Sequence, residues 1–430
     1  MKRILTTVLF TFSPFLFTFG SGLAFDAGAD LRIRQELMGN VPGLPGGGLV
    51  KTPCGKFKDH VRFRPRVWAE LKGDTEDFGK WRLFARIGDE FRWNIEPKNN
   101  ATSWPGELYL DNLFLEGKGL FDGFLDLKIG RQDLWGYCGL DHIFVDGTPG
   151  DGSRSIYSDM AALKFHVDED SSLDVFGLYN FDNADDLRWG HSYQRFSSLC
   201  SRFPNDEGNQ DDYGYGAIWS SKFAKNLPYQ VFAMQKRMRN VESGRNHTEL
   251  VGAKLTPKWN DGLSSAFEVM SELNSEWSAY ADLAWKSSAD GVKPFFKLGY
   301  HFMSKEWDPM WARAVNDSEM FLYGTHNGVA WWSNMHLLKL TAGLDFGAFH
   351  ALTFSTGPMF AAEADGIGGG NGYFKGELSQ VKYGFPLIVP DKGDRFEAHA
   401  HVLFEYFNPG DYYESSKGAW FFRWQIEFKF

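Results

Sequence analysis

After its first 24 residues, the sequence has no apolar run long enough to cross a membrane as an α-helix. Such a helix needs roughly 20 consecutive apolar residues, and charged or strongly polar residues interrupt every later candidate. The hydrophobic fraction is 43% and the mean hydropathy is -0.35. These values exclude a helical membrane protein.

Cysteine is scarce, and the motifs of several enzyme classes are missing. The three cysteines, Cys54, Cys138 and Cys200, are an odd number, so at least one is unpaired within the chain and no disulfide can be selected. Neither Cys-x-x-Cys nor a mixed Cys/His spacing indicates a metal site. A Gly-x-Ser-x-Gly elbow and a nucleotide-binding loop are also absent. We therefore expect no enzyme activity and no cofactor.

Basic charge is in deficit, and histidine offers little for a metal. The formal net charge of -10 argues against a nucleic-acid partner, because phosphate binding needs a basic face. His399 and His401 share one face of a candidate strand, but no third ligand has the spacing to join them. We therefore expect no metal site.

The chain begins with the features of an export signal. A basic pair precedes an uncharged run over residues 4–19, and small residues follow up to Ala24. This order predicts a signal peptide that is cleaved after Ala24. An uncleaved membrane anchor is the alternative, but Pro14 interrupts the run, which is also too short to span a bilayer. We expect a signal peptide over 1–24 and one barrel domain over 25–430.

Aromatic residues and glycine are abundant. Aromatics make up 17% of the chain, with 40 Phe, 16 Trp and 16 Tyr, and there are 47 glycines. Transmembrane β-barrels use both, because aromatic girdles lie at the two membrane interfaces and glycine serves the turns. Most Trp and Tyr side chains are expected in these girdles. Inward-facing ones, such as Trp68 and Tyr280, are candidates for stacking on sugar rings.

Alternation of apolar and polar residues is the clearest pattern, and the C-terminal segment shows it best. One face carries Trp420, Phe422, Trp424, Ile426, Phe428 and Phe430, and the other carries Phe421, Arg423, Gln425, Glu427 and Lys429. An apolar row that ends the chain on Phe430 is expected of a lipid-facing strand that closes a barrel. The terminal aromatic also resembles the signal read by the outer-membrane assembly machinery.

Two segments near the front alternate in the same way, but their polar faces are basic. These faces carry Arg62, Arg64 and Arg66 in one segment and Arg82, Arg86 and Arg92 in the other. Pro65 and Asp89 fall on the apolar faces, and a bulge or strand end is expected at Pro65. Arg or Lys facing lipid costs on the order of 2–4 kcal/mol at the bilayer midplane. The arginines are therefore expected to face a water-filled lumen.

Weaker alternation marks the other candidate strands, and turn residues mark their connections. The strands are expected at 27–36, 108–118, 124–132, 159–167, 172–180, 213–221, 229–237, 249–256, 263–272, 279–286, 293–302, 333–344, 349–357, 376–384 and 396–406. With the three strong segments they predict an antiparallel barrel of about 16–18 strands. Long extracellular loops are expected at 37–57, 94–106, 136–155, 180–212, 303–328 and 362–375. Short periplasmic turns are expected at 118–123 and 288–291.

Several motifs resemble the alginate-export family of outer-membrane barrels, whose best-known members pass a polyanionic polysaccharide out of the cell. They are Lys128-Ile129-Gly130-Arg131-Gln132-Asp133-Leu134, Asp146-Gly147-Thr148, Asp151-Gly152-Ser153-Arg154, Trp307-Asp308-Pro309-Met310-Trp311 and Asn408-Pro409-Gly410-Asp411-Tyr412-Tyr413. The resemblance runs from about residue 28 to the end of the chain. It implies that Arg131 and Arg154 reach the conduction path, where a guanidinium group binds a carboxylate through two hydrogen bonds.

The roles of the arginines stay open at this point. Arg131 and Arg154 have the alternative of bracing a loop to the wall through Asp133, Asp146 or Asp151. The six arginines of the basic segments have two compatible roles. Their field favours anions inside a pore, and they pair across strands with the acids Glu70, Asp89, Glu90 and Glu116.

We expect an all-β transmembrane antiparallel barrel in the bacterial outer membrane, in contact with lipid, lipopolysaccharide and the assembly machinery. The main prediction for its function is passive passage of an anionic solute or polysaccharide through an arginine-lined lumen. A diffusion porin for small organic acids or oligosaccharides is the alternative, and a constriction loop folded inward distinguishes it from an open track. A barrel enzyme acting on lipid needs an outward-facing Ser/His/acid cluster, and the inward-facing basic residues do not fit it.

Overall fold

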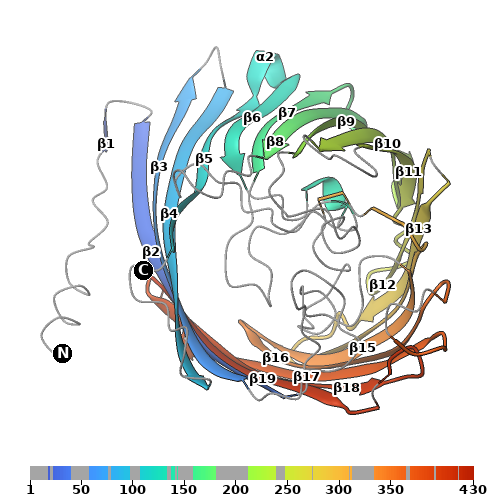
Figure 1. Ribbon diagram of the computed structural model, residues 1–430. Helices are drawn as coiled ribbons and strands as arrows, with labels where there is room; N and C mark the ends of the chain where they lie inside the picture. The colour runs from blue at the N-terminus through green and yellow to red at the C-terminus, as the bar shows by residue number, and fades with distance from the viewer. Residues whose placement is uncertain are drawn as a thin grey trace, which may run out of the picture.

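A ring of antiparallel β-strands makes up most of the chain that the computed structural model describes (Figure 1). The described residues are 18–19, 23–39, 58–75, 79–96, 107–132, 137–140, 143, 158–180, 212–238, 247–273, 275–308, 310–311, 334–364, 369–391, 394–414 and 416–430. Eighteen of the described strands, β2 to β19, form the ring, which closes where β19 pairs with β2. The two-residue strand β1 (Thr18–Phe19) pairs with the start of β2.

The strands of the ring follow one another in chain order. They are β2 (Leu23–Gly39), β3 (Lys58–Thr75), β4 (Gly79–Glu96), β5 (Glu107–Gly119), β6 (Leu125–Gln132), β7 (Ser158–His166), β8 (Ser172–Asn180), β9 (Asp212–Ala224), β10 (Leu227–Met238), β11 (His247–Leu255), β12 (Leu263–Glu272), β13 (Trp277–Lys286), β14 (Lys293–Met303), β15 (Met335–Gly347), β16 (His350–Phe360), β17 (Phe374–Ile388), β18 (Glu397–Pro409) and β19 (Ala419–Lys429). Two single turns, α2 (Leu120–Gly123) and η2 (Tyr137–Gly139), lie between them. Within the described ranges, no helix has the length and apolarity to cross a membrane.

The alternation in the sequence predicts these strands correctly. Each predicted segment overlaps one strand of the ring, and the number of strands lies at the top of the predicted range. Along β2, buried and less buried residues alternate from Gly28 to Met38, because even-numbered side chains face the interior and odd-numbered ones face outward. Large side chains on the outward face, such as Val67, Leu83 and Leu115, are exposed on the outside of the ring. The all-β antiparallel barrel is therefore confirmed.

The irregularity expected at Pro65 is an interruption in one ladder, and β3 continues through it. Pro65 pairs with β2, whereas the ladder between β3 and β4 stops at Phe63 and resumes at Arg66 in the same register. Proline has no N–H to donate, and the register places Asp89 opposite it. β4 nevertheless runs unbroken past Asp89. The two residues that depart from the alternation therefore meet at one weak point between the two strands.

The connections give the barrel two different ends. Tight connections join β3 to β4, β5 to β6 through α2, and β15 to β16, and we call this the short-turn end. The longer connections lie at the opposite end, the long-loop end. The tight turn predicted at 118–123 is confirmed, with positive φ angles of 54° at Phe121 and 60° at Asp122. The predicted loops at 37–57 and 94–106 begin too early, because β2 and β4 still find backbone partners on β19 and β3 there.

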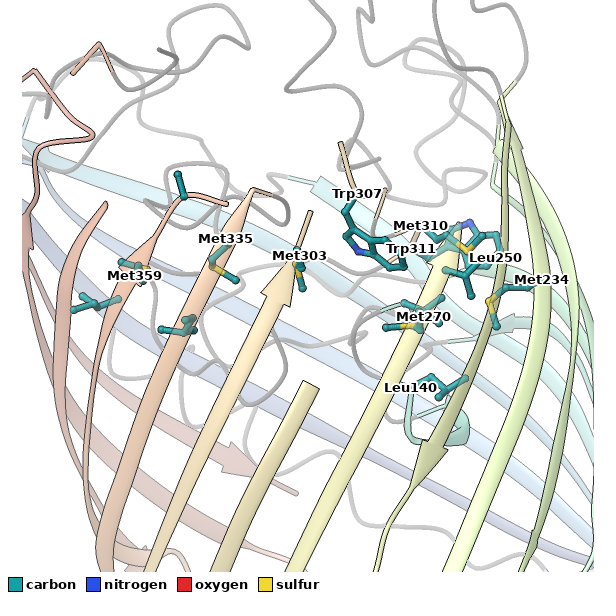
Figure 2. Packing of buried hydrophobic residues seen from close by; sticks show 14 of the residues in the cluster. Leu140, Met234, Leu250, Met270, Met303, Trp307, Met310, Trp311, Met335 and Met359 are labelled. Atoms are coloured by element: carbon teal, nitrogen blue, oxygen red, sulfur yellow. The ribbon is translucent and has the colours of Figure 1, made fainter. Parts of the chain in front are cut away.

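A methionine-rich apolar cluster fills one side of the interior at the long-loop end (Figure 2). Eight of the eleven methionines belong to it, most of them on the inward faces of β7 to β16. They pack with Trp307 and Trp311, which come from the connection after β14. The flexible thioether side chain fills irregular gaps, so this side of the ring is packed like a protein core. A few members of the cluster, such as Met38 of β2 and Phe421 of β19, lie on the opposite side. The rest of that side, from β19 through β4, is lined mainly by charged residues.

Candidate functional site

The inward faces of β19, β2, β3 and β4 carry a wall of arginines. Across three neighbouring strands, Arg34 pairs with Arg62 and Arg62 pairs with Arg92. Nearer the short-turn end, Arg32 pairs with Arg64. We call the following group the arginine wall: Arg32, Arg34, Arg62, Arg64, Arg66, Arg82, Arg86, Arg92 and Arg423. The structure thus brings together all six arginines of the two basic segments. It adds Arg423 from β19 and two arginines from β2 that sequence reasoning missed.

Glu36 is the main counter-charge at the long-loop end of the wall. Its side chain is fully buried, and its carboxylate oxygens lie 3.3 Å from Arg34 Nε, 3.0 Å from Arg62 Nε and 2.6 Å from Arg423 Nη2. His60 Nε2 lies 2.8 Å from the same carboxylate. Four groups from β2, β3 and β19 therefore share one acid. This arrangement fixes the arginines in place, because a buried charge is stable only when it is paired and hydrogen-bonded.

Other acids hold the rest of the wall. Arg66 Nε lies 2.8 Å and 2.9 Å from the two carboxylate oxygens of Asp30. Three of the pairs predicted from the sequence are present: Arg62 with Glu90 at 3.5 Å, Arg82 with Glu70 at 2.7 Å and Arg82 with Glu116 at 3.9 Å. Arginines still outnumber the acids between them, so the wall keeps an excess of positive charge. The cross-strand ion pairs and the excess of positive charge are therefore both present.

Arg64 has unsatisfied hydrogen-bond donors in the middle of the wall. Its side chain is 2% exposed, and its Nε and Nη1 atoms have no hydrogen-bond partner within the described ranges. The nearest acid contact is Asp30 Oδ1, 4.0 Å from Nη2. Like charges directly opposite each other also destabilise a sheet, and Arg32 lies directly opposite Arg64. This pairing is therefore unfavourable for the stability of the sheet.

Arg131 lies apart from the arginine wall. It shares the outward parity of β6 with Ile129 and pairs with Asp159 of β7. Its Nε and Nη2 donate to the two carboxylate oxygens of Asp159 at 2.8 Å and 2.9 Å, and Nη1 donates to the Leu110 carbonyl at 3.2 Å. These contacts agree with the bracing alternative, through an acid on the next strand rather than in a loop. Arg154 lies outside the described residues.

An aromatic stack continues the wall toward the short-turn end. Trp68 stacks on Phe84 with ring centroids 6.1 Å apart, and Phe84 stacks on Phe114 at 5.2 Å. The Arg82 guanidinium lies 4.6 Å from the Phe84 centroid, and the Lys128 ammonium lies 4.2 Å from the Phe114 centroid. These cation–π contacts hold Arg82 and one further positive charge, Lys128, on the inward face. Trp68 was predicted from the sequence, whereas its two phenylalanine neighbours were not.

Two segments fold into the lumen and cover the side opposite the arginine wall. The first contains η2, the short teal turn inside the ring in Figure 1. Gln230 Nε2 of β10 donates to the Cys138 carbonyl at 2.9 Å, and Lys254 Nζ of β11 donates to the Gly139 carbonyl. Because Gln230 and Lys254 face inward, η2 lies inside the barrel and against its wall.

The second inward segment runs from residue 304 to residue 311, and the structure describes its residues 304–308, 310 and 311. The Trp311 ring meets the Phe176 ring edge-on, with centroids 6.1 Å apart. The Trp311 N–H donates to the Ile143 carbonyl at 2.9 Å, which joins the two inward segments. The Trp-Asp-Pro-Met-Trp motif lies in this segment and had been singled out only for its resemblance to a family motif. Its tryptophans and methionine, in a stretch expected to be a polar loop, were the available signal that it packs against something apolar.

Histidine and cysteine form no metal centre in the part of the chain that the structure describes, where no three His, Cys, Asp or Glu side chains are placed to hold an ion. His399 lies 3.8 Å from Glu427 and stacks on Phe349. Tyr280, the other predicted inward aromatic, is buried against His301. His399 and His301 therefore both contact neighbouring side chains of the barrel.

Cys138 is a free thiol inside the barrel. Burial is the largest cause that raises its pKa, to about 12, because a low-dielectric environment disfavours the thiolate. Cys54 and Cys200 lie outside the described residues. With Cys138 unpaired, a disulfide within the chain has only the Cys54–Cys200 pair available.

The strand number and closure define the class of this protein, an 18-strand β-barrel of the bacterial outer membrane. Solved structures with the same fold include Pseudomonas aeruginosa OccK7 (OpdD), with a TM-score of 0.57 and 12% identity over 96% of this chain and 99% of that one. A BenF-like porin from Pseudomonas fluorescens Pf-5 gives 0.55 and 10% over 94% and 98%. Pseudomonas aeruginosa OccK5 (OpdH) gives 0.54 and 11% over 94% and 98%.

At these identities the likeness concerns the fold. No protein-family model and no curated protein matches the sequence. The outer-membrane location and the barrel are therefore established, whereas the finer resemblance to the alginate-export family stays a prediction.

Proposed function

We propose that the protein is an outer-membrane diffusion channel for small organic acids. The observation that supports this most is the position of the arginine wall opposite two segments that fold into the lumen. A cleft lined by one sign of charge raises the local concentration of counter-ions by a factor on the order of 10 to 1,000. Inward segments narrow the passage, which is the feature expected of a constricted porin rather than of an open track.

Carboxylates are the anions that this path suits best. Guanidinium groups match a carboxylate with two parallel hydrogen bonds. They follow one another from Arg62 near the long-loop end, through Arg66, to Arg82 near the short-turn end. A row of weak sites allows an anion to enter and still to leave. Arg131 is left out of this path because it is bound to Asp159 on the outward parity.

Passage of a polysaccharide, which the family resemblance implies, has less support. A polymer needs an unobstructed track, and η2 and residues 304–311 occupy one side of the lumen. One solved structure with this fold is described as a porin, which agrees with diffusion of small solutes. The polysaccharide reading therefore enters the test as a competitor.

Planar-bilayer recordings of the purified protein test the proposal. In a KCl gradient we expect a reversal potential of the sign that indicates anion preference. Gluconate and succinate are expected to reduce the chloride current by competition, whereas glucose is not. Cation preference, or equal effects of glucose and succinate, would contradict the proposal. Alginate oligomers that block at lower concentration than the small acids would favour the polysaccharide reading.

We further propose that residues 1–24 are removed on export and that the apolar outer surface contacts lipid and lipopolysaccharide. Cleavage after Ala24 leaves β2 to begin at Phe25, with the rest of the strand unchanged. Mass spectrometry of the protein from outer membranes is expected to find Phe25 as the first residue. A protein that keeps Met1 would identify the segment as an anchor.

A further inference from the structure

A buried polar cluster joins residues 304–311 to three neighbouring strands. Lys236 of β10, Thr248 of β11 and Glu272 of β12 face inward, and each is 1% exposed. Asp308 of the inward segment meets them and is 0% exposed. Buried charges are rare in proteins unless they are paired, so a cluster of this kind calls for an explanation beyond packing.

Asp308 is bound from every side. Lys236 Nζ lies 3.7 Å from Asp308 Oδ1 and donates to the Met310 carbonyl at 2.7 Å. Thr248 Oγ1 donates to Asp308 Oδ2 at 2.6 Å. The Asp308 N–H donates to Glu272 Oε1 at 2.6 Å, and Asp308 Oδ1 accepts the Met310 N–H at 2.9 Å. Both carboxylate oxygens and the adjacent backbone are therefore tied to the wall.

The surroundings of this cluster are apolar. Met234, Leu250 and Met270 line the wall beside it, and Trp311 packs over them (Figure 2). Methionine side chains adapt to many partners, so apolar contacts alone would allow the segment to settle in several positions. The charges favour a single position of the segment. A displaced segment would leave Lys236 buried among apolar side chains without the carboxylate of Asp308.

We propose that Asp308 and Lys236 form a latch that holds residues 304–311 in one position against the wall and thereby sets the free cross-section of the pore. Both are positioning residues, since they lie on the covered side, away from the arginine wall. The latch proposal rests on the proposed function in one respect only, which is that the barrel must contain an open pore. It does not depend on which solute passes.

The variant Asp308→Asn tests the latch. It keeps the shape of the side chain and an oxygen acceptor, but it removes the negative charge that lies 3.7 Å from Lys236 Nζ. We expect the segment to leave the wall, the unit conductance in KCl to rise above wild type, and chymotrypsin to cleave after Trp307 or Trp311. Both tryptophans are 2% exposed in the latched state. Heat-modifiable migration on gels reports separately whether the barrel has folded.

The double variant Lys236→Met, Asp308→Asn is the matched control. Replacing both members of a buried ion pair by uncharged groups of similar volume is often neutral for stability. We therefore expect this variant to recover protection from chymotrypsin and the wild-type conductance. Thr248→Val, which removes one hydroxyl donor and keeps the shape, is expected to show partial cleavage.

Wild-type conductance together with full protection in folded Asp308→Asn overturns the latch. If Asp308→Asn does not fold, Thr248→Val decides in its place, and protection equal to wild type overturns the proposal. A channel without anion preference whose segment is nonetheless released in Asp308→Asn would refute the proposed function and support the latch. The two proposals thus fail by different measurements.

Discussion

The two sides of the lumen pair their charges in different ways. On the arginine wall, guanidinium groups lie opposite one another across strands, and four cationic or polar groups share the single carboxylate of Glu36. On the covered side, four inward lysines each pair with an acid of their own: Lys164 with Asp174, Lys236 with Asp308, Lys254 with Glu268 and Lys297 with Asp282. Antiparallel backbone ladders join neighbouring strands on both sides. The excess of positive charge is therefore no requirement of the fold, and under the proposed function it marks the side that faces the solute.

The largest effect is expected from removing the shared acid. Glu36→Gln leaves the buried Arg34 and Arg423 beside a neutral group, and breaking a buried ion pair in this way costs about 3–5 kcal/mol. The measurement is the urea concentration at which the heat-modifiable form is lost in lipid vesicles. Glu268→Gln on the covered side, which loses only Lys254, is expected to shift that midpoint less. Equal shifts would remove the difference between the two sides.

The next largest effect concerns the seam where the arginine wall closes. The Phe430 N–H donates to the Ala29 carbonyl at 2.9 Å, and the Phe430 ring stacks on Phe396 with centroids 5.2 Å apart. Deleting Phe430 removes these contacts and the terminal aromatic, so the amount of protein in outer-membrane fractions is expected to fall. Phe121→Ser, an exposed aromatic in the α2 turn, is the control and is expected to assemble normally. Normal levels without Phe430 would show that the seam closes without it.

A smaller effect, on ion preference, sharpens the comparison directly. Arg62→Gln and Arg92→Gln together remove two adjacent positive charges from the wall without introducing acids. The reversal potential in a KCl gradient is expected to move toward cation preference. Lys297→Gln with Asp282→Asn removes a neutral pair from the other side and is expected to leave the potential unchanged. Similar shifts in the two double variants would assign the selectivity to the whole lumen.

The smallest effect tests how well the covered side is sealed. The Cys138 thiol, with its pKa raised to about 12 by burial, is protonated at neutral pH, and its reactive thiolate forms only as the pH approaches that value. In a Cys54→Ser, Cys200→Ser background, maleimide labelling of the folded barrel at pH 8 is expected to be much slower than in urea. Fast labelling of the folded protein would show that η2 leaves the wall.

Most of the fold could be predicted from the sequence, because each strand has one face in lipid and one face in water or protein. That difference produces the alternation of apolar and polar residues along strands such as β19 and β3. The arginines of β3 and β4 were identified for the same reason. Arg32 and Arg34 were missed because β2 also carries acids, so its polar face does not look basic in the sequence. Only the strand register shows that these two arginines lie beside Arg64 and Arg62.

The covered side could not be predicted, because loops have no period. The residues of the Trp-Asp-Pro-Met-Trp motif do not predict that Asp308 contacts Lys236. That contact depends on how the connection after β14 folds back into the barrel. Arg131 shows the opposite case. Its place in a family-like motif suggested the path, whereas the parity of β6 and the pairing with Asp159 put it on the outward face.

The seam between β19 and β2 has a consequence for how the ring is completed. Arg423 and Glu36 meet across it although 387 positions separate them in the chain. A shift of the seam by one residue turns every side chain of the strand to the other face, which would put Arg423 in lipid. A shift by two residues places it opposite Arg34 or Met38 in place of Glu36. Arg423 and Glu36 therefore meet only when the first and last strands close in the correct register. Their ion pair thus stabilises the correctly closed barrel over barrels closed in a shifted register.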